Sequence, residues 1–499
     1  MRAMAAVLFL VAMHGTQATV AAQATVSLSE YSERRADLVE QSGEDVILVL
    51  GDLPPEQDYL PFFPNSNFFY LTGFKEPGGD LLLVSEGDGH AETLFVPPRD
   101  ISYETWEGLR TGAQRAEERF GLPGRPNDEL EEAVGELLDQ GHHLAVVGDW
   151  DPNAEVRSEH TQRVRNLVDG RDDVEVRDIS DDVTHLRRIK SPAEKDLLRK
   201  TVEITSKAHR ELMRKVEPGM NEFEVQALVE YTFRRYGSYQ PAFESIVASG
   251  PNSTILHYNE NDRFMEAGDV LKVDIGASYR GYAADVTRTV PVDGTFSDEQ
   301  ADLYQLVLDA QIAAEELAEV DVPFRELAQA SQVTLAEGLT ELGLIEGPAA
   351  TYECEGPGGQ MGECPQLQLY YMHGLGHGIG LDVHDPWPPN LEPGTAFTIE
   401  PGVYVRPNLL TEVIPDTPRN QEVIDAIEPA FQTYAGIGIR IEDDYLMTEE
   451  GLEWLSTAPR EMEEVEELMA EEWDGPEPRN QDWVERYRET GIPPLEPGR

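Results

Sequence analysis

Four carboxylates in this 499-residue chain stand in segments that otherwise have the pattern of buried strands. Asp274 and Asp285 flank the Gly-rich centre of VLKVDIGASYRGYAADVTRTV, Glu400 follows the apolar run in AFTIEPGVYV, and Glu442 lies in GIGIRIEDDYLM. A carboxylate removed from water must pair with a cation or bind a metal. These segments therefore predict either ion pairs in the core or a metal site. For Glu442, the ion-pair alternative is a salt bridge with Arg440.

The segment with two aspartates is predicted to be a β-hairpin, because apolar residues alternate on both sides of its Gly-rich centre. With Tyr279 and Arg280 as a two-residue turn, Asp274 and Asp285 form a direct cross-strand pair, with Cβ atoms about 5 Å apart. Two ionised carboxylates at that distance repel unless a cation lies between them. The alternative is that one Asp is a turn residue and the other pairs with Arg288.

Three histidines follow in YMHGLGHGIGLDVHD, namely His373, His377 and His384. The glycines between the first two oppose a helix, and the Glu of HExxH is absent, which excludes a zincin motif. In an extended chain His373 and His377 point the same way. A lone histidine is often structural, but three beside glycines favour a functional site.

Charge balance favours metal over ion pairs. Asp274, Asp285, Glu400 and Glu442 bring four negative charges, His377 adds a neutral donor, and two divalent cations balance the set. Oxygen-rich ligation with one imidazole suits Mn²⁺, with Co²⁺ or Zn²⁺ as alternatives. A dinuclear site can bind a bridging water, lower its pKa and hold both oxygens of a tetrahedral intermediate.

The elements that position these residues form two parts. Residues 25–185 have the pattern of an α/β unit, with buried strand runs at 46–50 and 81–84 and helical patterns near 128–139 and 155–168.

Residues 186–460 have the pattern of an α+β domain, because helices and antiparallel strands occur in separate runs. Ser191, Pro192 and Glu194 start its first helix with a capping box, and Leu197, Leu198, Val202, Leu212 and Met213 are expected to face inward. The remaining helices are expected at 221–236, 298–318 and 324–342. Residues 461–499 are expected to form an acidic amphipathic helix, at 461–473, and a Pro-rich arm.

The overall charge restricts the partners. Asp plus Glu number 95 against 39 Lys plus Arg, a formal charge of -56. A nucleic-acid or anionic-membrane partner is therefore not expected, since phosphates need Lys and Arg. An acidic surface with few lysines suits high salt, and the alternative is an ordinary acidic protein.

The first 24 residues have the features of a secretory signal: Arg2, the apolar run 3–13 and the A-x-A site at 22–24. The mature chain is expected to begin near Thr25, exported to the periplasm or medium, and the alternative is an uncleaved N-terminal anchor. No later apolar run has membrane-spanning length. An oxidising compartment makes a disulfide between Cys354 and Cys364 plausible, with two free thiols as the alternative.

The same residues resemble the metallopeptidases of the pita-bread fold, which include methionine aminopeptidase, prolidase and Xaa-Pro aminopeptidase. The resemblance implies a pita-bread catalytic domain at 186–460 behind a smaller α/β domain at 25–185. The family's five metal ligands, in chain order, fall on Asp274, Asp285, His377, Glu400 and Glu442. It further implies that Asp285 and Glu442 bridge two metals, and that Glu400 binds one metal and transfers a proton.

The segments ILHYNEND, HGLGHGIGLDVHD, EPGVYV and GIGIRIEDD resemble the proline-specific branch of the family. This resemblance implies that the residues lining the substrate are His257, His373, His384, Tyr404 and Arg440. The N-terminal segments NSNFFYLTGFKEPGGDLLLV and RDISYETWEGLRTG resemble Xaa-Pro aminopeptidases. In some of these the tryptophan matching Trp106 reaches a neighbouring subunit's active site, which implies a homo-oligomer, a dimer or tetramer.

The resemblance thus implies an exported Xaa-Pro aminopeptidase, which hydrolyses the first peptide bond of peptides with proline at the second position. Glu400 would act as base and then acid, and a histidine, His384, would stabilise the oxyanion. The alternatives are a prolidase, which accepts only dipeptides, and a non-catalytic pita-bread binding protein. The presence of all five ligands disfavours the latter.

Overall fold

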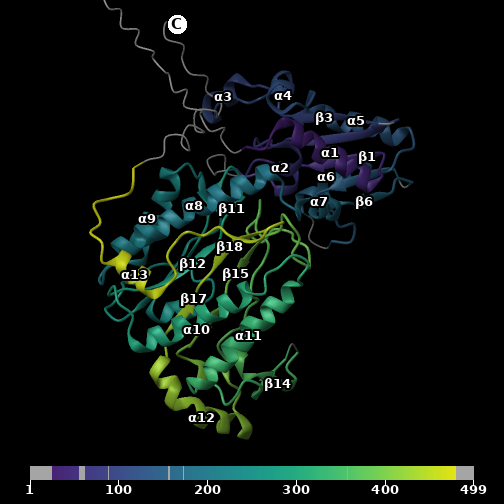
Figure 1. The fold of residues 1–499 in the computed structure, drawn as a ribbon. Helices are drawn as coiled ribbons and strands as arrows, with labels where there is room; N and C mark the ends of the chain where they lie inside the picture. Colours follow the sequence, from purple (N-terminus) through teal and green to yellow (C-terminus); the bar gives the residue numbers. More distant parts are fainter. Residues whose placement is uncertain are drawn as a thin grey trace, which may run out of the picture.

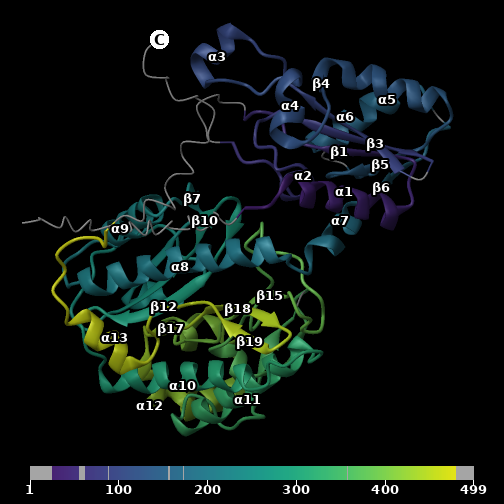
Figure 2. The same ribbon diagram turned by 45° about the horizontal axis from the view of Figure 1, so that its top comes forward.

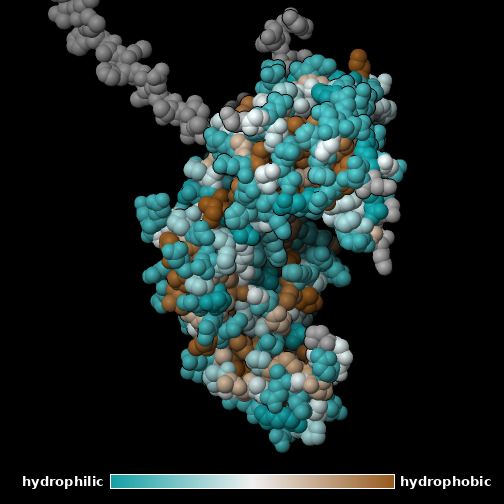
Figure 3. Space-filling view, turned by 90° about the vertical axis from the view of Figure 1, so that its right-hand side faces the viewer, coloured by the Kyte–Doolittle hydropathy of each residue, from teal (hydrophilic) through white to brown (hydrophobic). Residues whose placement is uncertain are grey.

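The computed structural model describes residues 25–478 except 56–61, 88, 155–157, 172 and 357. The expected signal segment and the end of the C-terminal arm lie outside the described residues. The chain folds into an N-terminal half, residues 25–187, and a C-terminal half, residues 188–478, and α7 (Ser180–Arg187) leads from one to the other (Figure 1). Figure 3 shows the molecular surface hollowed between the two halves.

The N-terminal half contains a six-stranded mixed sheet in the order β4-β3-β2-β1-β5-β6. Its strands are β1 (Val46–Leu50), β2 (Asp80–Glu86), β3 (Gly89–Val96), β4 (Gly124–Pro126), β5 (Leu144–Val147) and β6 (Val176–Asp178). Alternate residues of β1 enter different core clusters, Ile47 and Val49 in one and Val46 and Leu48 in the other. Both faces of the sheet are therefore covered, as expected for an α/β unit.

Seven helices of the described residues surround this sheet: α1 (Leu28–Ser42), α2 (Ser66–Thr72), α3 (Ile101–Glu107), α4 (Ala113–Phe120), α5 (Leu130–Asp139), α6 (Glu159–Val168) and α7. Helix α7 packs against α1 and α2. The expected strand runs and the helix near 128–139 are confirmed, and the helix expected at 155–168 begins at Glu159 in the described part of the chain.

In the C-terminal half, strands lie between two layers of helices (Figure 2). The helices α8 (Pro192–Lys215) and α9 (Glu222–Arg235) lie on one side, and α10 (Asp298–Glu315) and α11 (Phe324–Glu341) on the other, with α12 (Pro418–Tyr434) and α13 (Met462–Met469) further along the chain. The capping box at the start of α8 is confirmed, since Glu194 N donates to Ser191 Oγ at 3.2 Å and Ser191 N donates to Glu194 Oε2 at 2.9 Å. All five residues expected to face inward on α8 are buried.

The strands of this half form small antiparallel sheets. Their bounds are β7 (Gln240–Pro241), β8 (Ile246–Ser249), β9 (Val270–Ile275), β10 (Ala277–Tyr279), β11 (Tyr282–Ala283), β12 (Val286–Pro291), β13 (Thr351–Glu355), β14 (Met361–Pro365), β15 (Ala396–Ile399), β16 (Gly402–Tyr404), β17 (Gly438–Arg440), β18 (Asp443–Thr448) and β19 (Gly451–Trp454). The sheets have the orders β12-β9-β8, β15-β18-β19, β11-β10-β7, β16-β17 and β13-β14. An isolated bridge between Thr287 and Glu442 joins the first sheet to the segment between β17 and β18.

The expected hairpin of two aspartates forms, but the expected register is wrong. The turn begins one residue later, at Arg280 and Gly281, with φ of 55° and 96°. A tight two-residue hairpin turn favours positive φ at both positions, and glycine adopts it at no steric cost. Thr287, and not Asp285, therefore lies opposite Asp274. The pairing shifts by two residues, so both carboxylates keep the same face but are diagonal neighbours.

Two other expectations concern the C-terminal half. The disulfide between Cys354 and Cys364 is confirmed and links β13 to β14. The acidic helix is shorter than expected, because α13 ends at Met469, and Trp473 instead donates its indole N–H to Glu211 at 2.7 Å. No helix among the described residues is long and apolar enough to cross a membrane.

Candidate metal centre and active site

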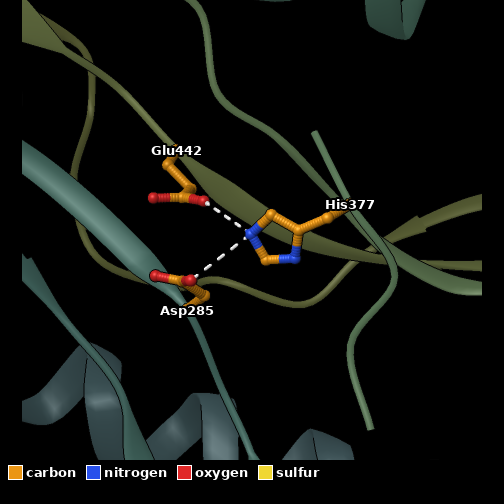
Figure 4. Close-up of side chains that lie close together, drawn as sticks. All are labelled: Asp285, His377 and Glu442. Carbon is orange, nitrogen blue, oxygen red and sulfur yellow. Dashed lines mark ion pairs between the residues drawn. The ribbon is translucent and has the colours of Figure 1, made fainter. Parts of the chain in front are cut away.

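Asp285, His377 and Glu442 converge from three separate segments of the C-terminal half (Figure 4). Asp285 precedes β12, His377 lies in the loop before β15, and Glu442 lies between β17 and β18. Each offers one ligand atom, and these atoms all lie within 4.8 Å of one another. His377 Nε2 is 3.5 Å from Asp285 Oδ2 and 3.9 Å from Glu442 Oε1. Two carboxylates and an imidazole at this spacing suit a divalent cation.

Glu400 lies beside this group, directly after β15. Its Oε1 is 3.7 Å from His377 Nε2, and its Oε2 is 3.7 Å from His373 Nδ1. Both histidines therefore turn toward one carboxylate, as the extended-chain argument predicted. The other nitrogen of His373, Nε2, lies 2.8 Å from the hydroxyl of Tyr404, which is fully buried.

Asp274 is held by Arg440 and stands outside the group of three. The guanidinium forms an ion pair with Asp274 Oδ2 and also donates to Thr287 Oγ1 at 3.2 Å and to Tyr404 Oη at 3.4 Å. The alternative in which Arg440 pairs with Glu442 is therefore wrong. Glu442 instead accepts from the Thr287 hydroxyl at 2.7 Å.

The other ion-pair alternative also fails. Arg288 pairs with Asp443 at 2.6 Å, and both side chains are completely buried. Arg288 is thus engaged away from Asp274 and Asp285. Nor is either Asp a turn residue, since the turn falls at Arg280.

Burial and mutual repulsion make the carboxylates costly to ionise. Burial, with the Glu442 and Asp274 carboxylates, raises the pKa of Asp285 well above its usual value. Burial, with the Glu400 and Asp274 carboxylates, does the same to the pKa of Glu442, although Arg440 opposes it. Burial also raises the pKa of Glu400 to about 7 against the pull of Arg440.

The histidines are shifted the other way, which favours the neutral imidazole that binds metals. Burial, followed by the charge of His384, lowers the pKa of His377 to about 4. Burial, followed by Arg440, lowers the pKa of His373 to about 3. In addition, Asp274 Oδ1 and Asp285 Oδ1 are buried with no hydrogen-bond partner among the described residues. Unpartnered acceptors, repelling carboxylates and neutral imidazoles together fit divalent metal ions.

Three further residues support the ligands, and the sequence reasoning missed them. Thr287 orients Glu442, Thr398 Oγ1 accepts from His377 N at 3.2 Å, and Asp444 Oδ2 accepts from Asp285 N at 3.0 Å. The run of acidic residues after Ile441 was a usable signal for Asp444, since consecutive buried acids need separate partners. Nothing in the local sequence distinguishes the two threonines.

The residues expected to line the substrate are brought together only in part. The His384 ring lies 4.0 Å from the His377 ring, between centroids. His257 is exposed on the loop after Thr254, close enough to lower the pKa of His373. Trp106 does not belong to this group within one chain. It lies on α3 with 86% of its surface exposed, and Figures 1 and 2 both place α3 at the upper edge of the N-terminal half, away from the strands β12, β15 and β18.

Comparison with known proteins agrees with this arrangement. Residues 196–449 match the model of metallopeptidase family M24, and residues 31–147 match the aminopeptidase P N-terminal domain. The Xaa-Pro aminopeptidase of Haemophilus influenzae is 33% identical over 468 residues, which is 90% of this chain and 99% of that protein. The human Xaa-Pro dipeptidase is 30% identical over 466 residues, 86% of this chain and 89% of that protein. A structure of Zn-substituted Escherichia coli aminopeptidase P in complex with product has a TM-score of 0.74 and 31% identity, covering 89% of this chain and 98% of that chain.

The chain belongs to metallopeptidase family M24. It carries both parts of aminopeptidase P, so the expected metallo-aminopeptidase and the expected α+β pita-bread domain behind an α/β domain are confirmed.

Proposed function

We propose that this protein is an exported Xaa-Pro aminopeptidase that removes the first residue from peptides with proline in second place. The observation that carries the proposal is the convergence of Asp285, His377 and Glu442 beside Glu400, in a chain with an aminopeptidase P N-terminal domain. The proposed boundaries are a signal at 1–24, domains at 25–185 and 186–460, and an acidic extension at 461–499.

The donor set supports two divalent ions per subunit, with Mn²⁺ favoured by the excess of carboxylate oxygens and Co²⁺ or Zn²⁺ as alternatives. Asp285, His377, Glu400 and Glu442 would hold them, joined by Asp274. Bound ions would lower the pKa of the attacking water and offset charge on the carbonyl oxygen. Zinc occupies the Zn-substituted Escherichia coli aminopeptidase P, which supports exchangeable metals here.

The protein's own residues would move the proton and orient the substrate. Glu400 faces both His377 and His373, so its carboxylate is placed to accept a proton from water and pass it to the leaving proline nitrogen. His384, beside His377, is placed to donate a hydrogen bond to the developing oxyanion. His373, Tyr404 and Arg440 form a linked hydrogen-bonded wall, and His257 lies at its exposed side.

A peptide-length series tests the proposal. We expect the metal-loaded enzyme to cleave Xaa-Pro peptides of two, three and five residues, and not matched Xaa-Ala peptides. Prolidase is the second candidate, supported by the similarity to the human Xaa-Pro dipeptidase. Cleavage of the dipeptide alone would establish prolidase instead, and no cleavage of any Xaa-Pro peptide would refute both.

Export has its own test, because it rests only on the sequence of the first residues. N-terminal sequencing of protein recovered from the medium or periplasm of its natural host should begin near Thr25. Recovery of the whole product in the cytosol with an intact N-terminus would refute export.

A further inference from the structure

The loop that carries His384 is tied to the N-terminal half by a group of charges, three of them buried, which we call the Asp385 cluster and define as Arg187, Lys190, Asp382 and Asp385. Arg187 Nη2 lies 2.5 Å from Asp385 Oδ1 and 2.5 Å from Asp382 Oδ2. Lys190 Nζ lies 2.8 Å from Asp385 Oδ2. The side chains of Arg187, Lys190 and Asp385 are 5%, 1% and 2% exposed, so their charges depend on one another.

Asp385 shapes the turn on which His384 stands. Its backbone N–H donates to Gly378 O at 2.8 Å, and its Oδ1 accepts from Asp382 N at 3.0 Å. A Cβ on Gly380 would lie 2.5 Å from the Asp385 carboxyl carbon, so the absence of a side chain there leaves room for the carboxylate. The Asp385 carboxylate therefore lies inside the turn and stabilises it, next to His384 in the chain.

The other side of the cluster belongs to the N-terminal half. Arg187 ends α7, and its Nη1 donates to Asn67 Oδ1 on α2 at 2.6 Å. Ser66, at the start of α2, donates to Asp382 Oδ1 at 2.5 Å. Helices α2 and α7 thus hold the same loop that places His384 beside the metal ligand His377.

A groove of about 1100 Å³ between the two halves is lined by Leu381, Asp382 and Val383 on one side and by Ser66 and Asn67 on the other. One short loop thus faces the interdomain groove at 381–383 and the metal centre at His384. A relative shift of the two halves would reach the metal centre through this loop.

We propose that Arg187 is a positioning residue through which the N-terminal half fixes the His384 loop against the metal centre. The inference rests on the proposed function, since it assigns His384 to the transition state. Arg187 touches neither a metal ligand nor the proposed oxyanion position, and it acts through Asp382 and Asp385. Its loss should lower kcat and leave KM and metal content nearly unchanged, because a misplaced oxyanion donor weakens the transition state alone.

The test compares variants of the full chain, in the metal-loaded state for kinetics and in the metal-free state for hydrogen exchange. Asp382→Ala removes the half-exposed partner and both of its contacts to the N-terminal half, while Asp385 keeps its ion pairs. Arg187→Gln removes the central cation, and Arg187→Lys restores a charge at that position. The matched control is Glu30→Gln, because Glu30 also joins the halves, accepting from Ser191 Oγ at 2.6 Å, but does not touch the loop.

We expect kcat to fall roughly threefold in Asp382→Ala and roughly tenfold or more in Arg187→Gln, as small misplacements of catalytic groups cost this much. Arg187→Lys should recover part of kcat, and Glu30→Gln should match the wild type. Hydrogen exchange of the metal-free protein should show faster exchange at 380–385 in the first two variants only. The kcat of the double variant Arg187→Gln/Asp382→Ala should be no lower than that of Arg187→Gln, because Arg187 acts through Asp382 and Asp385.

Unchanged kcat in Arg187→Gln and Asp382→Ala would overturn the proposal. An equal loss of kcat in the control Glu30→Gln would also overturn it, and so would a loss of kcat that is accompanied by loss of metal. Failure of the proposed function is separately visible, since the wild type would then not cleave Xaa-Pro peptides. In that case the hydrogen-exchange measurement still decides whether Arg187 orders the loop. Unchanged exchange at 380–385 in Arg187→Gln would refute that role of Arg187.

Discussion

Metal removal should destabilise this protein more at pH 8 than at pH 5. The prediction follows from the raised pKa values of Asp285, Glu400 and Glu442 in a metal-free site. When a carboxyl group has a higher pKa folded than unfolded, the folded chain binds more protons. The free energy of unfolding then falls as pH rises from the unfolded toward the folded pKa.

The magnitude can be worked for Glu400, whose pKa rises from 4.5 to about 7 on folding without metal. A shift of this size lowers the free energy of unfolding of the metal-free protein by about 3 kcal/mol between low pH and pH 8. Less than about 1 kcal/mol of this loss has occurred at pH 5. Asp285 and Glu442 act in the same direction. Bound cations replace the protons, so the metal-loaded protein does not carry this loss.

The assay is thermal unfolding of metal-free and Mn²⁺-saturated protein at pH 5, 6, 7 and 8 in fixed salt. At a few degrees per kcal/mol for a domain of this size, the Tm difference between the two forms should widen by roughly 5 °C or more. Comparing the two forms cancels the titration of the other acidic groups. Glu400→Gln cannot ionise, so its Tm difference should widen less.

A Tm difference that stays constant or narrows between pH 5 and pH 8 would refute the reasoning. It would mean that the carboxylates are not held in mutual repulsion when the metal is absent. The burial of these carboxylates would then need an explanation other than metal binding.

Three further predictions concern the site, the surface and the assembly. Asp285→Ala or Glu442→Ala should abolish activity and metal binding together, whereas Glu400→Gln should keep some metal while losing turnover; near-normal turnover of Asp285→Ala would contradict a dinuclear site. The Tm of metal-saturated protein should rise from low to molar NaCl, because salt screens the formal charge of -56; a flat or falling Tm would leave an ordinary acidic protein. Trp106→Ala should lower kcat/KM for longer peptides in a homo-oligomer while the fold and metal content remain, since an indole that is 86% exposed in one chain is available to a second copy. A fully active monomer, or unchanged kinetics of this variant, would show that Trp106 does not serve a second copy's active site.

The sequence was sufficient for features whose causes are local. The capping box at Ser191 needs only a residue that accepts a hydrogen bond and a Glu three positions later, and both hydrogen bonds form. The disulfide between Cys354 and Cys364 closes a ten-residue separation in the hairpin of β13 and β14. The shared direction of His373 and His377 follows from the period of an extended chain.

The hairpin register shows where local reasoning is too coarse. Alternation determines which face a residue takes, so Asp274 and Asp285 share a face as predicted. It does not determine which residues are opposite, because a shift by two preserves the alternation. That choice depended on Gly281, which allows the turn to begin at Arg280, one position later than expected.

Partners far apart in sequence could not be predicted. Arg440 is two residues from Glu442 but pairs with Asp274, 166 residues earlier in the chain. Arg187 lies 195 residues from Asp382 and belongs to the other half of the molecule. Each such pairing depends on how sheets and halves pack, which no motif or period specifies.

These distant pairings explain why the candidate metal centre is short of positive charge. Elsewhere in the core, Asp443 has Arg288 and Arg460 against it, and Asp385 has Arg187 and Lys190. At the centre, one guanidinium offsets one of four carboxylates, that of Asp274. Three negative charges remain against neutral imidazoles, and the two divalent ions of the proposed site would exceed them by one positive charge. A site with one surplus positive charge complements the single negative charge of a tetrahedral oxyanion. In the proposed dinuclear site, the arginine would therefore adjust the charge of the site to that of the transition state, as well as holding Asp274 and Tyr404.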